Sequence, residues 1–268
     1  MKRSEIFRRL HHAPPVLRLP NCWDPASARI FEVAGFPAIG TSSAAVANAL
    51  GAQDGDCLDV STHLAAIARI TAVVSVPVSV DFESGYAADT AKLSRNIARL
   101  ATTGAAGYNL EDSRVKGELY TLAEQCERIA AAKAAAPLLF LNARTDIFLA
   151  GIGNAESRLE RSKERLAAYL EAGADGVFVP GISDEATIGD IARAFRKKPL
   201  NILAGPSTPP VAELERIGVS RVSVGSWPMR RTMSVLRDIA RELHRDGSFG
   251  FMREPMIPYE EMNALFTR

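Results

Sequence analysis

The segment Val76–Tyr86, VPVSVDFESGY, has the pattern of a short buried strand that ends in acidic residues. Apolar and polar residues alternate from Val78 to Glu83, which predicts a β-strand with one polar side. We expect Asp81 and Glu83 to lie together on that side. Asp and Glu are poor strand formers and are rarely buried without a partner. The two carboxylates therefore indicate a hard cation or a reacting acid, although a solvated edge strand would show the same pattern.

The composition is that of an ordinary soluble globular protein. The chain has 268 residues, a net charge of +1, 47% hydrophobic residues and 24% charged residues. This charge balance favours neither nucleic acid nor a membrane surface as a partner. The first residues, MKRSEIFRRLHH, lack the apolar core of a signal peptide, and no apolar run is long enough to span a bilayer. The three cysteines, Cys22, Cys57 and Cys126, have no metal-binding spacing, so we expect a reducing, cytoplasmic location.

Strand-like and helix-like segments alternate along the chain without a linker that would divide residues 1–268 into two domains. The expected strands are Val16–Asn21, Ala38–Ser42, Val78–Glu83, Gly107–Asp112, Leu138–Arg144, Gly176–Gly181, Asn201–Gly205 and Arg221–Gly225. Expected helices include Ser4–His12, Thr90–Thr102, Leu119–Ala135, Ala155–Ala172, Thr187–Phe195 and Pro210–Ile217. Eight strands with crossover helices predict an α/β fold, a (β/α)8 barrel of the TIM type with an additional N-terminal helix. A doubly wound sheet is the alternative, but no GxGxxG or Walker pattern is present.

In such a barrel, functional side chains lie where the strands end. Polar residues follow the first five expected strands: Asn21, Trp23, Asp24, Thr41, Ser42, Ser43, Asp81, Glu83, Asn109, Glu111, Asp112, Asn142, Arg144 and Asp146. Alternation in the fifth strand places Arg144 on the same side as Asn142 and Asp146. We therefore expect Arg144 to point inward with the acids, where a structural ion pair is the alternative to a functional role.

The chemistry of this cluster favours Mg²⁺, with Mn²⁺ as a possible substitute, because both prefer oxygen ligands. A guanidinium such as that of Arg144 can bind a substrate carboxylate through two hydrogen bonds. A metal and an arginine together would hold a 2-oxo acid and stabilise the enolate that forms when a bond beside the carbonyl breaks. The histidines do not accompany these residues, so a zinc site is not expected. We expect the adjacent His11 and His12 to lie at the surface or in an interface.

Five motifs together resemble the isocitrate lyase / phosphoenolpyruvate mutase superfamily over nearly the whole chain: LPNCWDPASARIFEVAGFPAIGTSS, LGAQDGD, VSVDFESGY, YNLEDS and NARTDIFLAG. The resemblance implies a (β/α)8 barrel that uses Mg²⁺ to stabilise an enolate while a C–C or P–C bond breaks or forms. Asp81 resembles the acid nearest the metal, and Glu83 and Glu111 resemble acids that hold it largely through water. Asp54 resembles a further acid of that network, and Arg144 resembles the arginine that contacts the substrate.

The resemblance also implies which residues contact or transform the substrate. The segment from Thr41 to Ser43 resembles the one that grips the carboxylate and carbonyl of the substrate. Catalytic roles would fall to Arg144, Glu111, Thr41, Ser42 and Ser43, and the substrate would lie beside Trp23, Ser42, Ser43, Asp81, Asn142 and Arg144. A small-molecule carboxylate is therefore the expected partner.

The connection after the fourth strand departs from the superfamily. Isocitrate and methylisocitrate lyases carry a Lys-Cys-Gly-His type loop there, and phosphoenolpyruvate mutase and phosphonopyruvate hydrolase carry a longer gating loop with a Lys and an Asn-Ser pair. The corresponding segment of this chain is EDSRVKGELY, without Cys or His. The proton donor would then be Arg114, Lys116, Glu118 or a bound water.

These features predict a Mg²⁺-dependent lyase that cleaves a C–C bond in a small 2-oxo or 2-hydroxy carboxylate through an enolate. Decarboxylation of oxaloacetate is one such reaction, because its leaving group, carbon dioxide, needs no protonation. The alternatives are a P–C bond enzyme of the phosphonopyruvate type and a barrel that binds a carboxylate without turnover.

The C-terminal segment, residues 228–268, is expected to be a helical extension of the barrel. Its apolar residues recur at helical spacing at Met229, Met233, Leu236, Ala240 and Leu243. The six arginines between Arg230 and Arg253 favour a solvated helix face. The superfamily resemblance implies that this segment is exchanged between subunits of a homodimer or homotetramer.

Overall fold

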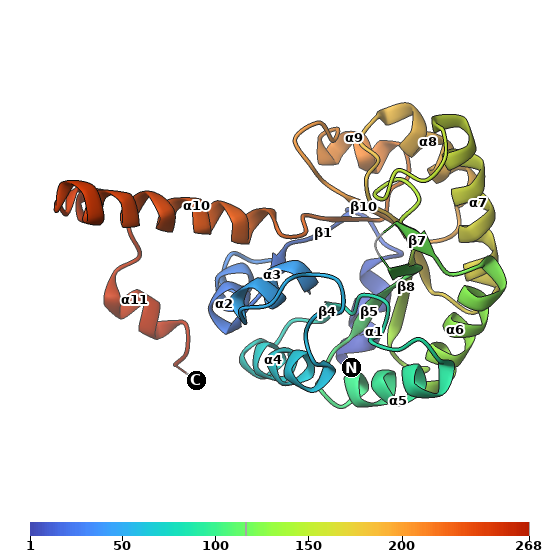
Figure 1. Cartoon of the computed structure of the whole chain (residues 1–268), viewed down its shortest axis with the longest axis horizontal. Coiled ribbons are helices and arrows are strands. Elements are labelled where there is room, and N and C mark those ends of the chain that lie inside the picture. Colours follow the sequence, from blue (N-terminus) through green and yellow to red (C-terminus); the bar gives the residue numbers. More distant parts are fainter. Residues whose placement is uncertain (116, 268) are drawn as a thin grey trace.

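A ring of parallel strands forms the centre of the structure, a computed structural model that describes residues 1–115 and 117–267. The sheet order is β1-β11-β10-β9-β8-β5-β4-β3-β2. β1 (Leu17–Leu19) and β2 (Asn21–Cys22) are two pieces of one strand, which is interrupted at Pro20 because proline has no N–H to donate. β1 pairs with β11 and β2 pairs with β3, so the ring closes through this strand. The predicted (β/α)8 barrel is confirmed (Figure 1).

Each predicted strand is present, and the structure adds a hairpin that the sequence analysis missed. The remaining barrel strands are β3 (Ile39–Thr41), β4 (Val78–Asp81), β5 (Gly107–Glu111), β8 (Phe140–Arg144), β9 (Gly176–Val179), β10 (Leu200–Leu203) and β11 (Arg221–Ser223). The short antiparallel hairpin consists of β6 (Ser113–Val115) and β7 (Glu118–Leu119). Because β7 occupies the start of the predicted helix Leu119–Ala135, the observed helix begins later, after its N-cap at Thr121.

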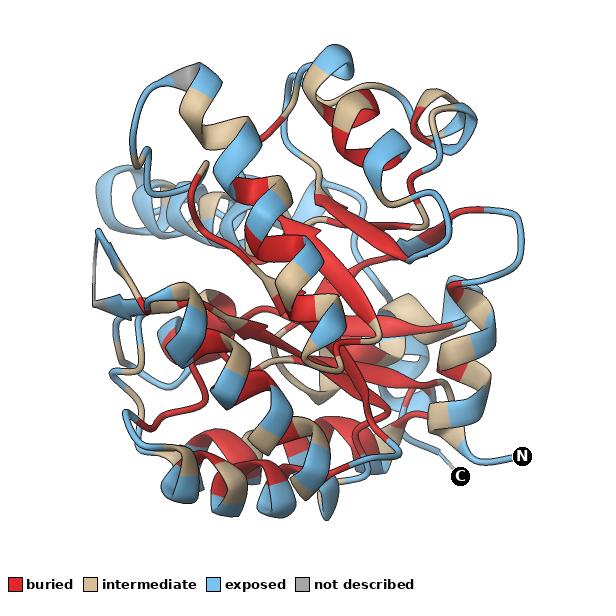
Figure 2. Ribbon diagram, turned by 90° about the vertical axis from the view of Figure 1, so that its right-hand side faces the viewer, coloured by how far each residue is buried: buried red, intermediate tan, exposed pale blue. Residues whose placement is uncertain are grey.

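Helices surround the barrel and bury one side against it, apart from those of the C-terminal segment (Figure 2). Their bounds are α1 (Arg3–Leu10), α2 (Pro25–Val33), α3 (Ser43–Ala49), α4 (Val60–Val73), α5 (Thr90–Ala101), α6 (Leu122–Ala135), α7 (Ala155–Glu171), α8 (Glu185–Ala194), α9 (Val211–Arg216), α10 (Trp227–Arg241) and α11 (Tyr259–Ala264). A π-helical turn (Glu242–Asp246) and a 3₁₀ turn (Gly250–Arg253) lie between the last two. Within the described residues, no helix is both long and apolar enough to cross a membrane.

The apolar core has two parts. A large cluster lies between the strands and the surrounding helices and includes Val80, Leu110 and Leu141. A smaller cluster consists of Phe7 from α1, which packs with barrel residues such as Leu19 and Phe140. The N-terminal helix therefore helps to close the end of the barrel opposite the strand ends that carry the acids.

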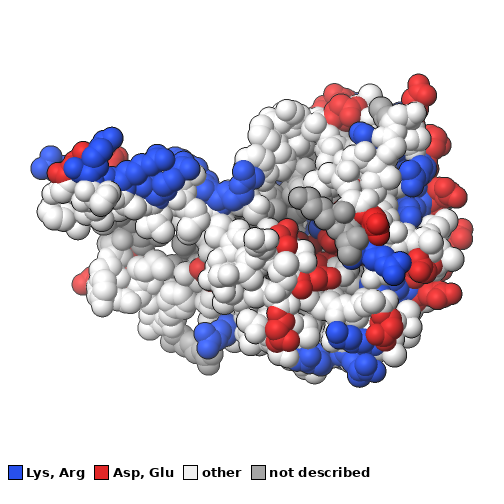
Figure 3. Space-filling view, in the orientation of Figure 1, with Lys and Arg blue, Asp and Glu red and all other residues white. Residues whose placement is uncertain are grey.

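α10 projects away from the barrel (Figure 1). Large apolar side chains are exposed along it and just after it, at Met233, Val235, Leu236 and Leu243. A row of basic side chains runs along one edge of this projecting arm (Figure 3). Such an exposed amphipathic helix buries its apolar side only when another surface covers it.

His11 is buried at the end of α1, with 4% of its surface exposed. The expectation of a surface or interface position is therefore wrong for His11, whereas His12 is exposed. The reason is the aromatic cluster beneath the barrel: the His11 ring stacks on Phe140 with centroids 4.0 Å apart. Its Nδ1 lies 2.8 Å from the carbonyl oxygen of Phe7. Burial, followed by the charge of Arg221, lowers the pKa of His11 to about 3, so its ring is neutral.

The buried neutral ring of His11 predicts a loss of stability in acid. The ordinary pKa is 6.5, so below that pH the unfolded chain binds a proton that folded His11 does not bind until about pH 3. Between pH 6.5 and 5 this difference costs about 2 kcal/mol. From pH 7 to 5, we expect the free energy of unfolding of His11→Phe to fall by about 2 kcal/mol less than that of the wild type. Urea denaturation measures it, with His12→Phe as the control, and equal losses in His11→Phe and wild type would contradict the assignment.

Gly107 lies where β5 passes closest to the aromatic cluster. A Cβ at this position would lie 2.7 Å from the carbonyl oxygen of Phe140 and 2.9 Å from a ring carbon of Phe7. Because the backbone oxygen cannot move without shifting β8, we expect Gly107→Ala to lower the free energy of unfolding by about 1–3 kcal/mol. Gly205→Ala is the matched control, since no atom lies within 4 Å of the added Cβ there. Equal unfolding midpoints for the two variants would refute this packing constraint.

Candidate active site

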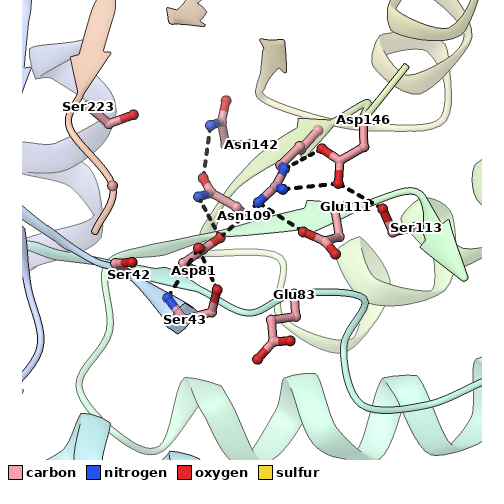
Figure 4. A network of polar contacts seen from close by, with 12 residues as sticks. Ser42, Ser43, Asp81, Glu83, Asn109, Glu111, Ser113, Asn142, Asp146 and Ser223 are labelled. Carbon is pink, nitrogen blue, oxygen red and sulfur yellow. Dashed lines mark hydrogen bonds and ion pairs between the residues drawn. The ribbon is translucent and has the colours of Figure 1, made fainter. Parts of the chain in front are cut away.

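Three of the predicted site residues meet at the carboxyl ends of β4, β5 and β8 (Figure 4). The strand register places Asp81 beside Asn109 and Glu111 beside Arg144. The Nη1 atom of Arg144 lies 2.9 Å from Glu111 Oε2 and 3.7 Å from Asp81 Oδ1. Arg144 therefore points inward among the acids, as its position in the strand predicts.

Asp146 holds the other side of the Arg144 guanidinium. Nε and Nη2 of Arg144 donate hydrogen bonds of 2.6 and 3.0 Å to the two carboxylate oxygens of Asp146. Ser113 in turn donates to Asp146 over 2.7 Å. Burial opposes the charge on Arg144, but Asp146, Glu111 and Asp81 outweigh it and raise the pKa of Arg144 well above its ordinary value. The two-pronged contact that the sequence analysis assigned to a substrate is made here with Asp146, and Nη1 is left to face the site.

Both carboxylate oxygens of Asp81 are held by neighbouring strands and loops. Oδ2 accepts hydrogen bonds from the backbone N–H and the hydroxyl of Ser43, at 3.2 and 3.0 Å. Oδ1 accepts one from the Asn109 amide at 3.1 Å. The hydroxyl of Thr41 accepts from the backbone N–H of Asp81, and Ser42 caps the N-terminus of α3. Of the predicted segment from Thr41 to Ser43, only Ser43 thus contacts the Asp81 carboxylate.

Glu83 reaches the site from a turn rather than from the strand. β4 ends at Asp81, and Glu83 has a φ of 48°, in the left-handed region that non-glycine residues seldom adopt. The expectation that Asp81 and Glu83 share one side of a strand is therefore wrong, because the chain turns between them. The carboxylate of Glu83 accepts hydrogen bonds from the Tyr86 hydroxyl at 2.5 Å and from the backbone N–H of Asp56. Burial raises the pKa of Glu83 to about 7.

The residues that hold Glu83 were missed by the sequence analysis. His63 is fully buried on α4, and its Nδ1 contacts the hydroxyl of Tyr86. Burial lowers the pKa of His63 to about 4, which keeps its ring neutral. Asp56 accepts a hydrogen bond from Ser84 in addition to its backbone contact with Glu83. The one signal in the sequence was the position of Tyr86 in the turn that follows the acids, whereas His63 lies 23 residues before Tyr86.

The other predicted residues lie at different distances from this centre. Asp54 is in an exposed loop, but its carboxyl faces Ser43 and is partly shielded from water. This partial burial, followed by the charge of Asp81, raises the pKa of Asp54. Asn142 donates to Asn109 over 2.9 Å and to Asn201 over 3.3 Å, so it supports Asn109 from within the barrel. The side chain of Trp23 is half-buried, and its backbone N–H donates to Ser27.

Two of the predicted proton donors lie on the hairpin formed by β6 and β7. Arg114 and Glu118 are exposed there, and Lys116 lies outside the described residues. Arg114 lies 5.9 Å from the centre of the Tyr120 ring. Cys22 is no substitute for a catalytic cysteine, because burial raises the pKa of its thiol to about 12.

The donor atoms at this site fit a hard divalent cation. They are carboxylate oxygens, which Mg²⁺ prefers. Burial raises the pKa of Glu111, Glu83 and Asp54, so a cation bound among them would favour their ionised form. In the described part of the chain, no three His, Cys, Asp or Glu side chains converge closely enough to surround a metal. Mg²⁺ usually retains several waters, so an ion here would not need all of its ligands from the protein.

The fold and the site define a class of protein: a (β/α)8 barrel with acids and one inward arginine at the carboxyl ends of its strands. Comparison with known sequences identifies the family. The sequence profile described as phosphoenolpyruvate phosphomutase matches residues 7–244. The chain therefore belongs to the phosphoenolpyruvate mutase family, within the isocitrate lyase / phosphoenolpyruvate mutase superfamily.

Individual relatives cover nearly the whole chain. An uncharacterized protein of Mycobacterium tuberculosis is 34% identical over 96% of this chain and 95% of its own. The phosphoenolpyruvate phosphomutase of Streptomyces hygroscopicus is 30% identical over 97% of this chain and 86% of its own. The crystal structure of a protein from Burkholderia cenocepacia, provisionally described as a lyase/mutase, superimposes with a TM-score of 0.90 at 34% identity, covering 99% of this chain and 96% of that one.

More distant relatives have several named activities. A 2-methylisocitrate lyase of Bacillus subtilis is 28% identical over 98% of this chain and 85% of its own. A phosphonopyruvate hydrolase of Variovorax is 27% identical over 84% of this chain and 81% of its own. A crystal structure of a phosphonopyruvate hydrolase in complex with oxalate and Mg²⁺ shares the fold, with a TM-score of 0.87 at 24% identity over 99% of this chain and 95% of that one. The superfamily thus includes lyases, mutases and hydrolases.

Proposed function

We propose that this protein is a Mg²⁺-dependent lyase that cleaves a C–C bond in a small 2-oxo or 2-hydroxy carboxylate through an enolate. The observation that carries the proposal is the position of Arg144, whose Nη1 lies beside Asp81 and Glu111 at the mouth of the barrel. A cation site next to an inward guanidinium suits a ligand with adjacent carboxylate and carbonyl oxygens. The lyase and hydrolase relatives support this class of chemistry.

Each residue has a distinct part in this proposal. Asp81 would hold the metal, because Ser43 and Asn109 already orient both of its oxygens. Arg144 would bind the substrate carboxylate through Nη1, since Asp146 occupies Nε and Nη2. When bound, Mg²⁺ would act as a Lewis acid toward the carbonyl oxygen of the substrate. The waters of the ion would be held by the remaining acids, Glu83, Glu111 and Asp54.

A second candidate is cleavage or transfer of a P–C bond in a phosphonopyruvate-type substrate. The match to the phosphoenolpyruvate phosphomutase profile and the phosphonopyruvate hydrolase relative favour it. The same metal and arginine would serve this reaction, because loss of carbon dioxide from oxaloacetate and cleavage of the P–C bond of phosphonopyruvate both leave the enolate of pyruvate. Cleavage of a 2-hydroxy acid would instead release the 2-oxo acid and leave the enolate on the other carboxylate fragment. The two candidates differ in the group that leaves, and the β6–β7 hairpin, which follows Glu111 closely in the chain, would be the segment that meets this group.

The experiment that tests the proposal is a substrate panel. Release of pyruvate or another 2-oxo acid is measured with and without Mg²⁺ from oxaloacetate, 2-methylisocitrate, 2-alkylmalates and phosphonopyruvate. Metal-dependent release from a carbon substrate would support the lyase, and release from phosphonopyruvate alone would support the second candidate. No release from any of them, together with no exchange of the C3 protons of pyruvate in D₂O, would indicate a barrel that binds a carboxylate without turnover.

Asp81→Asn tests the metal site directly. The substitution keeps the shape of the side chain but removes the charge that binds the ion, so we expect Mg²⁺ affinity to fall by about 100-fold or more. Isothermal titration calorimetry without substrate measures it. Asp190→Asn is the matched control, because Asp190 lies on α8 and is paired with Arg193 away from the site. Unchanged Mg²⁺ affinity in Asp81→Asn would exclude Asp81 as the ligand.

We also propose that the protein is a homodimer or homotetramer in the cytoplasm, with the C-terminal segment exchanged between subunits. The apolar side chains exposed on the projecting arm support this assembly, because a second copy would cover them. The three cysteines are free, which suits a reducing compartment.

Leu236→Glu tests the assembly. Leu236 is 54% exposed on α10 within the single chain, and a carboxylate there would be buried in the exchanged arrangement. We expect the variant to be a monomer in light scattering after size-exclusion chromatography, whereas the wild type is a dimer or tetramer. Arg237→Glu introduces the same charge at the adjacent position and should leave the assembly intact. A monomeric wild type, or a Leu236→Glu variant of unchanged mass, would contradict the proposal.

A further inference from the structure

Arg221 lies inside the barrel, beneath the candidate active site. It is the first residue of β11 and only 1% of its surface is exposed. Its side chain extends to β5 on the other side of the ring, where Nη2 donates a hydrogen bond of 3.2 Å to Oδ1 of Asn109. The sequence carries no signal for this position, because an arginine at the start of a strand commonly lies at the surface.

The charge of Arg221 has no direct counter-ion in the described part of the chain. No carboxylate oxygen there lies within 4.0 Å of its nitrogens, and both Nε and Nη1 are buried without a hydrogen-bond partner. Two other buried arginines are held differently: Arg165 pairs with Asp112, and Arg128 donates to three backbone carbonyls. Burial lowers the pKa of Arg221 to about 9, which leaves it charged at neutral pH.

Among the described residues, the groups beneath Arg221 do not neutralise its charge. The ring of Phe7 lies 5.9 Å from its guanidinium carbon, and His11 beside that ring is neutral. An unpaired buried charge adds no stability, since an apolar side chain of similar shape would usually serve at least as well. The charge of this arginine therefore acts on the candidate active site, which lies above it.

A chain of hydrogen bonds leads from Arg221 up to the site. Oδ1 of Asn109 accepts from Arg221 and from Asn142, so the amide of Asn109 has one orientation and its Nδ2 faces Asp81 at 3.1 Å. Asp81 is also the acid whose charge favours the charged form of Arg221 and partly opposes the lowering of its pKa by burial. In the low-dielectric interior of a barrel, the field of a unit charge is screened far less than in water.

We propose that Arg221 supplies a fixed positive charge beneath the site that strengthens binding of a dianionic ligand, namely the enolate of a 2-oxo acid. This inference rests on the proposed function. Arg221 is a positioning residue, because it contacts Asn109 and not the ligand. The same charge repels a divalent cation, so it has opposite effects on the two ligands: it favours the carboxylate and disfavours the bare ion.

The opposite effects of Arg221 on the binding of a carboxylate and of Mg²⁺ can be tested in the whole protein. Oxalate, which has the adjacent carboxylate oxygens of a pyruvate enolate, is titrated into the Mg²⁺-loaded protein by calorimetry, and Mg²⁺ is titrated separately without oxalate. We expect Arg221→Met to weaken oxalate binding on the order of tenfold and to leave Mg²⁺ affinity unchanged or increased. Arg221→Lys, which keeps the charge, should restore most of the oxalate affinity. His11→Phe alters packing at the same depth without altering charge, and should leave both affinities unchanged.

Each other outcome overturns the proposal. Unchanged oxalate affinity in Arg221→Met would show that the charge does not reach the ligand, and equal weakening of oxalate and Mg²⁺ would show that the site has merely lost its structure. If Arg221→Met does not fold, Arg221→Lys provides the test. A tenfold loss of oxalate affinity in Arg221→Lys would show that a positive charge at this position does not strengthen oxalate binding. A wild type that binds Mg²⁺ but not oxalate would overturn the proposed function as well, whereas an unaffected Arg221→Met overturns this inference alone.

Discussion

The candidate site depends on one guanidinium among several carboxylates. Arg144 contacts Asp146 through two hydrogen bonds and Glu111 through an ion pair of 2.9 Å, and its Nη1 lies 3.7 Å from Oδ1 of Asp81. Carboxylates gathered in a low-dielectric interior repel one another and would protonate without a cation nearby. Arg144 allows them to coexist, and the strands that carry these residues are placed so that the guanidinium lies between them. The remaining negative charge is what makes a divalent cation a suitable ligand.

The barrel interior is polar for most of its height, which links the fold to the site. A chain of side-chain hydrogen bonds joins Asn201 to Asn142, Asn142 to Asn109, and Asn109 to Asp81. Asn21 closes the ring in a similar way. Its oxygen accepts from the backbone N–H groups of Val224 and Gly225, directly after the last strand, and its amide donates to the carbonyl of Thr41. A connected buried network of this kind has few alternative arrangements. The orientation of the Asp81 carboxylate is consequently a property of the whole barrel and not of β4 alone.

The family and the reaction are determined by different parts of the chain. The barrel, the acids and Arg144 place the protein in the phosphoenolpyruvate mutase family, whose superfamily includes lyases, mutases and hydrolases. The segment after Glu111, in contrast, folds as a short hairpin of β6 and β7 with exposed side chains such as Arg114. Because the loops that follow the strands of a (β/α)8 barrel can vary while the strands persist, a change in this one connection can alter the reaction without altering the fold.

The sequence by itself determined the eight strands, the barrel and the inward direction of Arg144, because alternation and strand order are local properties that the ring must obey. It also identified Asp81 and Glu111 as strand-end acids. Only the tertiary structure decided that Glu83 lies in a left-handed turn and contacts Tyr86, and that His11 is buried beneath the barrel. These outcomes depend on contacts between residues distant in sequence or on a reversal of the chain direction, and periodicity carries no information about either.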